Sequence, residues 1–312
     1  MFRPGQVWRD TDGKPIQAHG GGVLYDRGTY YWYGENKAGP TLPLSRVDVV
    51  GVSCYSSTDL HTWKNEGIVL PAVPGDPGHD LHPSKVAERP KVLYNAKTKQ
   101  YVLWLHVDSP DYTYARTGRA VSDSPTGPFE YVGSIPPLGK DSRDMTLFGD
   151  TDGTAYVVFS SDRNSVTRIA RLSDDYLDTT DTAVEAFRAP QNYSGRESPA
   201  MFTHEGRYYF IGSGCTGWAP NRAEYAVAPS PLGPWEVKGD PCAGPGAEMT
   251  FGGQNTFVLP VADRPGAFLL MLDRWNPADL QDSRYVWLPL EVDGDRLTAR
   301  WHDEWDLSVF DT

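Results

Sequence analysis

Apolar and polar residues alternate along much of the chain with a period of two, which is typical of half-buried β-strands. Stretches with the 3.6-residue period and end signals of an amphipathic helix are missing. Five runs rich in aromatic and β-branched residues resemble one another, and four of them follow a turn signal that ends in Gly. They span residues 28–35, 100–107, 153–160, 206–213 and 266–273. We predict that each run is the second strand of a β-hairpin.

The aromatic parts of the five runs begin near residues 29, 100, 154, 207 and 267, at spacings of 53 to 71 residues. A turn of small residues closed by an aromatic follows three of them, at 57–63, 124–129 and 230–235, and leads into a further short strand. A four-stranded antiparallel sheet repeated about every 50–60 residues is typical of a propeller blade. We therefore predict an all-β, five-bladed β-propeller that forms one domain over residues 1–312. The alternative is an irregular β-sandwich, which does not need the same second-strand motif five times.

Composition agrees with many short strands joined by turns, since the chain has 31 Gly, 26 Pro and 38 aromatic residues (10 Trp, 17 Tyr and 11 Phe). Its formal net charge of −12 argues against nucleic acid as a partner, because phosphate binding needs a basic surface. The absence of a run of about 18 apolar residues argues against a membrane span. We expect a monomer.

The cysteines and the first residues bear on the compartment. Cys54, Cys215 and Cys242 form no CxxC pair, so we expect reduced structural thiols, with a Cys215–Cys242 disulfide as the alternative in a secreted form. The start, MFRPGQVWRD, shows no secretory signal. Either the protein is intracellular, or a signal was removed before this numbering begins.

The predicted first strand of every unit carries a polar residue. First strands of a propeller converge on a central channel, where small apolar side chains would otherwise be expected. The segments are 16–22, 87–91, 142–146, 195–199 and 252–256. They carry Gln17 and His19, Glu88, Asp144, Glu197, and Gln254, respectively. Any one of these could be a solvated loop residue, but polar groups at equivalent positions in five repeats predict a shared site at the channel mouth.

Carboxylates that face one channel, with aromatic rings nearby, are the groups that a glycosidase requires. One carboxyl must stay protonated near neutral pH, through burial or a neighbouring negative charge. Aromatic rings stack on the apolar faces of sugars. The aromatics near these strand ends are Trp32, Tyr33, Tyr112, Tyr114, Trp218 and Trp275, although most aromatic residues should be core between the blades.

Several stretches, spanning nearly the whole chain in order, resemble glycoside hydrolase family 43 and in particular its exo-β-1,3-galactanase branch. They include IQAHGGGVLYDRGTYYWYGENK, ERPKVLYNAKTKQYVLWLH, SRDMTLFGDTDGTAYVVFSS, ESPAMFTHEGRYYFIGSGCTGW, FGGQNTFVLP and DRWNPADLQDSRYVWLPL. The resemblance implies an inverting exo-glycoside hydrolase that releases galactose from β-1,3-galactan, the backbone of arabinogalactan. The alternatives are another family 43 specificity, such as α-L-arabinofuranosidase or β-xylosidase, and a catalytically silent sugar-binding propeller.

The family pattern has an Asp base on the first blade, an Asp on the third that orients the acid, and a Glu acid on the fourth. The last two fall on Asp144 and Glu197, whereas Gln17-Ala18-His19 stands in place of the first Asp, a departure typical of the galactanase branch. Gln254 is the branch's signature on the fifth blade. We expect Gln254 to hold the attacking water; a neutral amide is a poor base, although its imidic tautomer could accept a proton.

Further residues are expected to bind the sugar and not to react with it. They are Glu88, Glu35, His19, Gln17, Tyr112, Trp218 and Asn221. The substrate would be an oligosaccharide or polysaccharide, and the reaction needs no cofactor. Relatives in the family sometimes hold a calcium ion in the channel, so the resemblance allows a structural calcium, but no ligand spacing in this sequence requires a metal.

Overall fold

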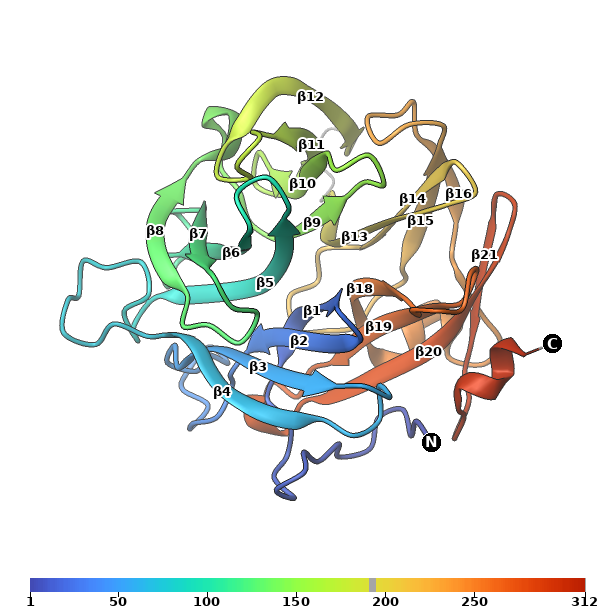
Figure 1. Ribbon diagram of the computed structural model, residues 1–312, viewed down its shortest axis with the longest axis horizontal. Coiled ribbons are helices and arrows are strands. Elements are labelled where there is room, and N and C mark those ends of the chain that lie inside the picture. Colours follow the sequence, from blue (N-terminus) through green and yellow to red (C-terminus); the bar gives the residue numbers. More distant parts are fainter. Residues whose placement is uncertain (191–194, 312) are drawn as a thin grey trace.

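Five β-sheets surround a common centre in the computed structural model, which describes residues 1–190 and 195–311 (Figure 1). Blade 1 holds β1 (His19–Asp26), β2 (Thr29–Glu35), β3 (Gly51–Ser57) and β4 (Lys64–Pro71). Blade 2 holds β5 (Val86–Asn95), β6 (Gln100–Asp108), β7 (Arg116–Ser122) and β8 (Glu130–Ile135). In both sheets the strands follow one another in sequence order and pair antiparallel.

The next two blades repeat this plan. Blade 3 holds β9 (Met145–Gly149), β10 (Ala155–Ser161), β11 (Val166–Leu172) and β12 (Thr179–Arg188). Blade 4 holds β13 (Glu197–His204), β14 (Arg207–Ser213), β15 (Glu224–Ala228) and β16 (Glu236–Gly239).

Blade 5 has an additional strand. It holds β18 (Gln254–Pro260), β19 (Phe268–Arg274), β20 (Arg284–Asp293) and β21 (Arg296–Arg300), and the two-residue β17 (Cys242–Ala243) pairs parallel to β21. The helices are short 3-10 turns: η1 (Pro137–Gly139), η2 (Ala247–Gly252), η3 (Leu280–Asp282) and η4 (Leu307–Phe310). In the described residues no helix has the length and hydropathy to cross a membrane.

The predicted all-β, five-bladed propeller is confirmed, and each of the five aromatic runs is the second strand of its blade: β2, β6, β10, β14 and β19. Strand alternation sends neighbouring side chains to opposite faces of a blade, so each blade packs on both neighbours. Trp32 packs with residues of blade 5, and the adjacent Tyr33 packs with residues of blade 2. Both are buried in these seams, so these two of the aromatics named near the strand ends belong to the core between the blades.

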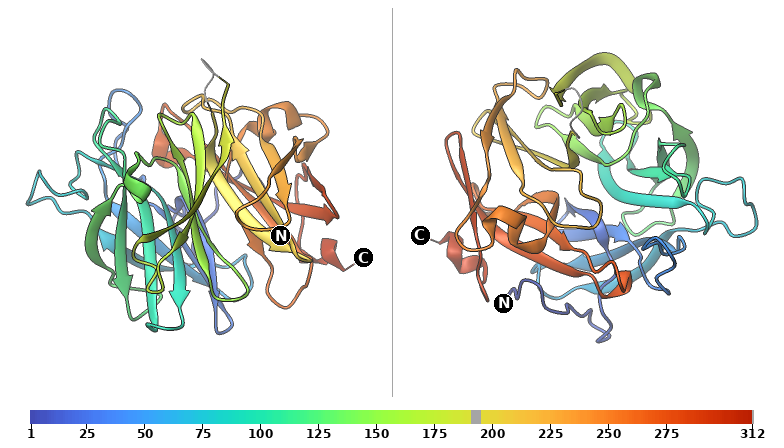
Figure 2. Two further views of the ribbon diagram at one scale, coloured as in Figure 1. Left: turned by 90° about the horizontal axis from the view of Figure 1, so that it is seen from above. Right: turned by 180° about the vertical axis from the view of Figure 1, so that it is seen from behind.

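The two ends of the chain meet beside blade 5 (Figure 2). The backbone N–H of Phe2 donates to the carbonyl of Trp305 at 2.6 Å, the N–H of Trp305 donates back at 3.1 Å, and the two rings stack with centroids 4.1 Å apart. Cys54, Cys215 and Cys242 are free thiols, as expected from the sequence, so the alternative Cys215–Cys242 disulfide is not formed.

Candidate active site

A β-bulge interrupts the first strand of blades 1, 2 and 4 just after a polar residue. The register shifts follow His19, Glu88 and Glu197. The next residue has a left-handed backbone in each case: φ is 58° at Gly20, 56° at Arg89 and 51° at Ser198. A bulge bends its strand and changes the direction of the neighbouring side chain. The same local device therefore places Glu88 and Glu197 at the channel mouth, whereas His19 is buried in the interior.

A carboxylate from a neighbouring blade fixes each bulge. The bulge N–H donates to it in three equivalent hydrogen bonds: Gly20 to Asp273 Oδ2 at 2.9 Å, Arg89 to Glu35 Oε1 at 3.0 Å, and Ser198 to Asp144 Oδ2 at 2.9 Å. Left-handed conformations cost ordinary residues about 1 kcal/mol or more, so Arg89 and Ser198 need such a support. We call these three contacts the bulge latches.

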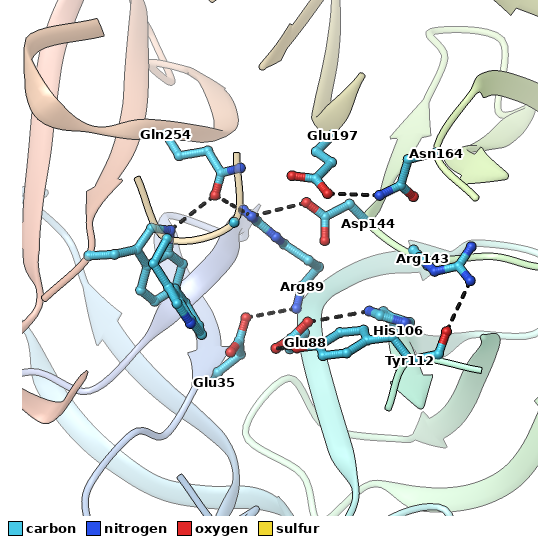
Figure 3. Close-up of a pocket in the computed structure, with 13 residues that line it drawn as sticks. Glu35, Glu88, Arg89, His106, Tyr112, Arg143, Asp144, Asn164, Glu197 and Gln254 are labelled. Carbon is cyan, nitrogen blue, oxygen red and sulfur yellow. Dashed lines mark hydrogen bonds and ion pairs between the residues drawn. The ribbon is translucent and has the colours of Figure 1, made fainter. Parts of the chain in front are cut away.

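A pocket of about 320 Å³ opens at the channel mouth (Figure 3). Seven of the predicted site residues line it: Glu35, Glu88, Tyr112, Asp144, Glu197, Trp218 and Gln254. Every blade contributes at least one of them. Blades 2 to 5 do so at the equivalent positions that the repeats predicted, but blade 1 contributes Glu35 from its second strand and neither Gln17 nor His19. Tyr114, named above as a nearby aromatic, is not among the lining residues, whereas Trp275 is.

Three predicted residues lie outside this pocket. His19 is fully buried, with its Nδ1 3.1 Å from Asp273 Oδ1, so it supports a bulge latch and does not face the sugar. Gln17 is also buried, and its amide donates to the carbonyl of Gln281 at 2.8 Å. Asn221 exchanges hydrogen bonds with Gly214 at 2.7 and 2.9 Å and so holds a loop together. The polar pattern identified the strands correctly, but it could not show which groups already had internal partners.

The pocket also contains residues that the sequence reasoning did not single out: Arg89, His106, Arg143 and Asn164. Two of them carried a signal. Arg89 directly follows Glu88, and His106 lies opposite Glu88 in the antiparallel register of β5 and β6. Arg143 and Asn164 lie in loops, where no strand period predicts the direction of a side chain.

Glu197 is the carboxyl best suited to carry a proton. Burial raises its pKa, and the negative charge of Asp144 raises it further, to about 8. Asn164 donates to Glu197 Oε1 at 2.7 Å, which fixes the orientation of the carboxyl group and leaves Oε2 to carry the proton. The group is therefore protonated at neutral pH, as a general acid must be.

Asp144 is fixed from two sides. Its Oδ2 accepts from the backbone N–H of Ser198 at 2.9 Å and lies 3.0 Å from Nη2 of Arg89. Because Ser198 directly follows Glu197, the latch that holds this bulge also places the charge of Asp144 beside the acid.

The amide of Gln254 has only one orientation that satisfies its neighbours. Its Oε1 accepts from Arg89 Nη2 at 2.7 Å and from Trp275 Nε1 at 3.0 Å, and both of these groups can only donate. Its Nε2 donates to Ser213 Oγ at 3.0 Å, and its second N–H has no partner among the described residues. The oxygen of Gln254 accepts from two donors, which favours the amide form. In the imidic tautomer this oxygen would carry a hydrogen that faces both donors, so that tautomer is disfavoured.

Glu35 and Glu88 lie opposite Glu197 across the pocket (Figure 3). Burial raises the pKa of Glu35, whose carboxylate is 2.7 Å from Lys37 Nζ and latches Arg89. Burial alone would also raise the pKa of Glu88, but the neighbouring imidazole of His106 and the charge of Lys37 lower it to about 2. Glu88 is thus an ionised acceptor.

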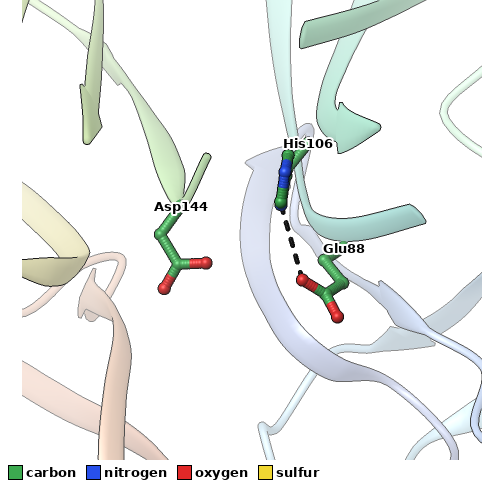
Figure 4. A group of neighbouring side chains, drawn as sticks. All are labelled: Glu88, His106 and Asp144. Carbon is green, nitrogen blue, oxygen red and sulfur yellow. Dashed lines mark ion pairs between the residues drawn. The ribbon is translucent and has the colours of Figure 1, made fainter. Parts of the chain in front are cut away.

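Glu88, His106 and Asp144 lie close enough together to be tested as a metal site, with one potential ligand atom of each within 4.8 Å of the others (Figure 4). The imidazole does not fit this role. Its Nδ1 is 3.4 Å from Glu88, its Nε2 is 2.9 Å from Asp108, and its pKa is raised to about 9. A protonated ring that faces two carboxylates has no lone pair for a metal. With its ring protonated, His106 forms an ion network with these carboxylates.

Comparison with known proteins agrees with this geometry. The profile of "Glycosyl hydrolases family 43" matches residues 17–262. The chain is 40% identical to a solved family 43 β-1,3-galactosidase, BT3683, with galactodeoxynojirimycin, over 98% of this chain and 100% of that one, with a TM-score of 0.90. An exo-β-1,3-galactanase from Phanerochaete chrysosporium with β-1,3-galactotriose is 36% identical over 98% and 68%, with a TM-score of 0.88.

A third similar structure, an exo-β-1,3-galactanase from Clostridium thermocellum, is 35% identical over 97% of this chain and 65% of that one, with a TM-score of 0.85. A comparison with curated protein sequences finds no match. The propeller and its acid pocket, together with these likenesses, define a glycoside hydrolase. The chain belongs to glycosyl hydrolase family 43.

Proposed function

We propose that this protein is an inverting exo-glycoside hydrolase that releases galactose from the ends of β-1,3-galactan chains. The observation that carries the proposal is the protonated Glu197 beside Asp144 in a pocket to which all five blades contribute. The similar structures with 35–40% identity are β-1,3-galactosidases and exo-β-1,3-galactanases, and one of them was solved with β-1,3-galactotriose. This supports galactose in preference to arabinose or xylose.

In this proposal Glu197 gives its proton to the oxygen of the departing sugar, and Asp144 keeps the pKa of Glu197 high enough for it to do so. Gln254 holds the attacking water through its second amide N–H, since its oxygen accepts from Arg89 and Trp275. The water oxygen bonds to the anomeric carbon as the bond to the departing oxygen breaks, and the proton that the water loses passes to solvent in the pocket. Glu88 accepts hydroxyl hydrogens of the bound galactose. Inversion requires that the water and the acid act from opposite faces of the sugar.

The test is to incubate the protein with β-1,3-galactan, arabinan and aryl glycosides and to identify the released monosaccharide. Galactose released from β-1,3-galactan alone supports the proposal, whereas arabinose or xylose would indicate another specificity of the family. Binding without any release would indicate a silent sugar-binding propeller.

Two substitutions test the proposed roles separately. Glu197→Gln should abolish turnover of natural galactosides, and normal activity in this variant would contradict its role as the acid. Gln254→Ala should lower kcat by about 100-fold or more with KM nearly unchanged, because it removes a group needed for the chemical step. Glu88→Gln should instead raise KM.

A further inference from the structure

His106 lies opposite Glu88 on the second strand of blade 2, and the residues at the same position in blades 1 and 5 hold a bulge. The residues paired with the presented side chains on the second strand are Glu35 in blade 1, His106 in blade 2, Ser213 in blade 4 and Asp273 in blade 5. Glu35 and Asp273 latch the bulge of the next blade. The pairing of β9 with β10 in blade 3 shows no register shift, so His106 has no such bulge to latch.

His106 is instead part of a buried row of charges within its own blade. Its Nδ1 lies 3.4 Å from Glu88 Oε2, and its Nε2 lies 2.9 Å from Asp108 Oδ2. The side chains of His106 and Asp108 are 1% and 0% exposed. Asp108 is itself fixed, because its Oδ1 accepts from the backbone N–H of Ser109 and of Ala115, both at 2.8 Å. Glu88 and His106 line the pocket, whereas Asp108 does not.

The other cations at the pocket are already engaged. Arg89 contacts Asp144 and Gln254, Lys37 contacts Glu35, and Arg143 contacts Asp141. A largely buried carboxylate without a counter-charge is costly. The charge of Lys37 also favours the ionised form of Glu88, but the cation that pairs with Glu88 is His106. The titratable groups that face His106 are Glu88 from β5, Asp108 from β6 and Asp144 from the segment before β9, with the ring of Tyr112 at 6.0 Å. All three carboxylates favour its protonated form.

We propose that His106, held by Asp108, is a positioning residue that keeps Glu88 ionised and aimed into the pocket as an acceptor for sugar hydroxyls. Glu88 Oε1 accepts from the hydroxyl of Tyr112 at 3.0 Å, and Oε2 faces His106. Each oxygen keeps a further lone pair for the substrate. Burial alone would lower the pKa of His106, but the hydrogen bond to Asp108 and the charges of Asp108 and Glu88 raise it to about 9, which agrees with this role. The inference rests on the proposed function, since it explains how the sugar-binding carboxylate of that site is held.

A double-mutant cycle tests whether His106 acts through Glu88. The variants are His106→Gln, Glu88→Gln and the double variant, assayed on β-1,3-galactobiose. Each single substitution should lower kcat/KM by about 10-fold to 100-fold, mainly through KM, because it weakens charge-assisted hydrogen bonds. The double variant should be no more than about threefold worse than Glu88→Gln alone. Effects that multiply fully would overturn the proposal.

If His106 had only a structural role, its loss of a proton would not change how galactose binding depends on pH. Binding of galactose is therefore measured by calorimetry from pH 6 to pH 10. The wild type should bind galactose more weakly above about pH 9, where His106 loses its proton. Asp108→Asn should move this loss at least about one pH unit lower. An unchanged pH dependence in Asp108→Asn would contradict the proposal.

The chain offers a matched control in the His19–Asp273 pair, which is equally buried at 3.1 Å and lies outside the pocket lining. His19→Gln should lower stability but leave the pH dependence of galactose binding in place. NMR titration of the imidazoles needs no substrate: a resonance of His106 that titrates near pH 6.5 would overturn the inference. Failure of the wild type to cleave galactobiose, with His106 still titrating near pH 9, would count against the proposed function instead.

Discussion

The pKa of Glu197 is raised to about 8, whereas that of Glu88, across the same pocket, is lowered to about 2. Burial raises the pKa of both groups, so the difference comes from their neighbours. Glu197 faces the negative charge of Asp144, and Glu88 faces the protonated His106. Two identical side chains thus obtain opposite protonation states, which is what a proton donor and a hydroxyl acceptor require.

The pH dependence of activity follows from the acid. Because Glu197 must be protonated to act, kcat/KM on β-1,3-galactobiose should fall above about pH 8, by about tenfold per pH unit. β-Galactosyl fluoride does not need a protonated leaving group, so its hydrolysis should lack this decline near pH 8. If the fluoride shows the same decline, the titrating group is not the acid.

At the scale of elements, the bulges decide where the polar residues of the first strands point. Gly20 has φ of 58°, and a Cβ there would lie 2.2 Å from Glu35 Oε1, the atom that latches Arg89. Gly28, in the turn between β1 and β2, has φ of 86° and open space around it. Alanine substitutions at these two glycines therefore distinguish the cost of a strained backbone from the cost of losing the Glu35 latch.

We predict that Gly28→Ala costs about 1 kcal/mol of stability, which is the price of the left-handed backbone alone. Gly20→Ala should cost about 1–3 kcal/mol more, because the added methyl group displaces Glu35. Urea denaturation of both variants measures this difference. Equal losses would mean that the Glu35 latch adds nothing to stability.

Asn221 holds the loop of residues 214–221 in place through hydrogen bonds to its backbone and side chains. It holds Gly214 and donates to Thr216 at 2.7 Å, and the loop between them and Asn221 carries Trp218 into the pocket. Asn221→Ala should raise KM by about tenfold with little change in kcat, because the stacking surface becomes less ordered. Asn65→Ala, which removes a turn hydrogen bond of 2.8 Å on the outer strand β4, is the control. A fall in kcat without a change in KM would contradict this interpretation.

The sequence predicted the blades because a strand repeats every two residues and a blade repeats its aromatic second strand. The bulges were hidden, since only Gly20 has a residue type that indicates a left-handed backbone, and Arg89 and Ser198 do not. The position of His19 on a first strand was read correctly, but its partner Asp273 lies far away in sequence and turns it away from the sugar. Long-range partners are what the local pattern cannot show.

At the scale of the whole molecule, the seam between blades 1 and 5 closes the ring. Half of the ten tryptophans gather there: Trp8, Trp32, Trp63, Trp287 and Trp305. The neighbouring blades 1 and 5 come from opposite ends of the chain, so this seam cannot form from local contacts. Its large buried rings offset the entropy of closing the ring.

Trp305→Ala should lower the free energy of unfolding by about 3–5 kcal/mol, because it leaves a cavity beside Phe2 and removes the ring that stacks on it. Val309→Ala, in the same C-terminal segment but 36% exposed, should change stability by less than about 0.5 kcal/mol. Chemical denaturation followed by tryptophan fluorescence measures both. A loss below about 1 kcal/mol for Trp305→Ala would show that the seam does not depend on this contact.

The bulge latches have a practical consequence for anyone who wishes to capture a bound sugar. The backbone beside Glu88 is held by the N–H of Arg89, which donates to Glu35, and the backbone beside Glu197 by the N–H of Ser198, which donates to Asp144. Neither hydrogen bond uses the side chain of Glu88 or Glu197. Both glutamates can therefore be substituted while the bulge latches next to them stay in place. Inactive variants for trapping sugar complexes can thus be made without disturbing the channel.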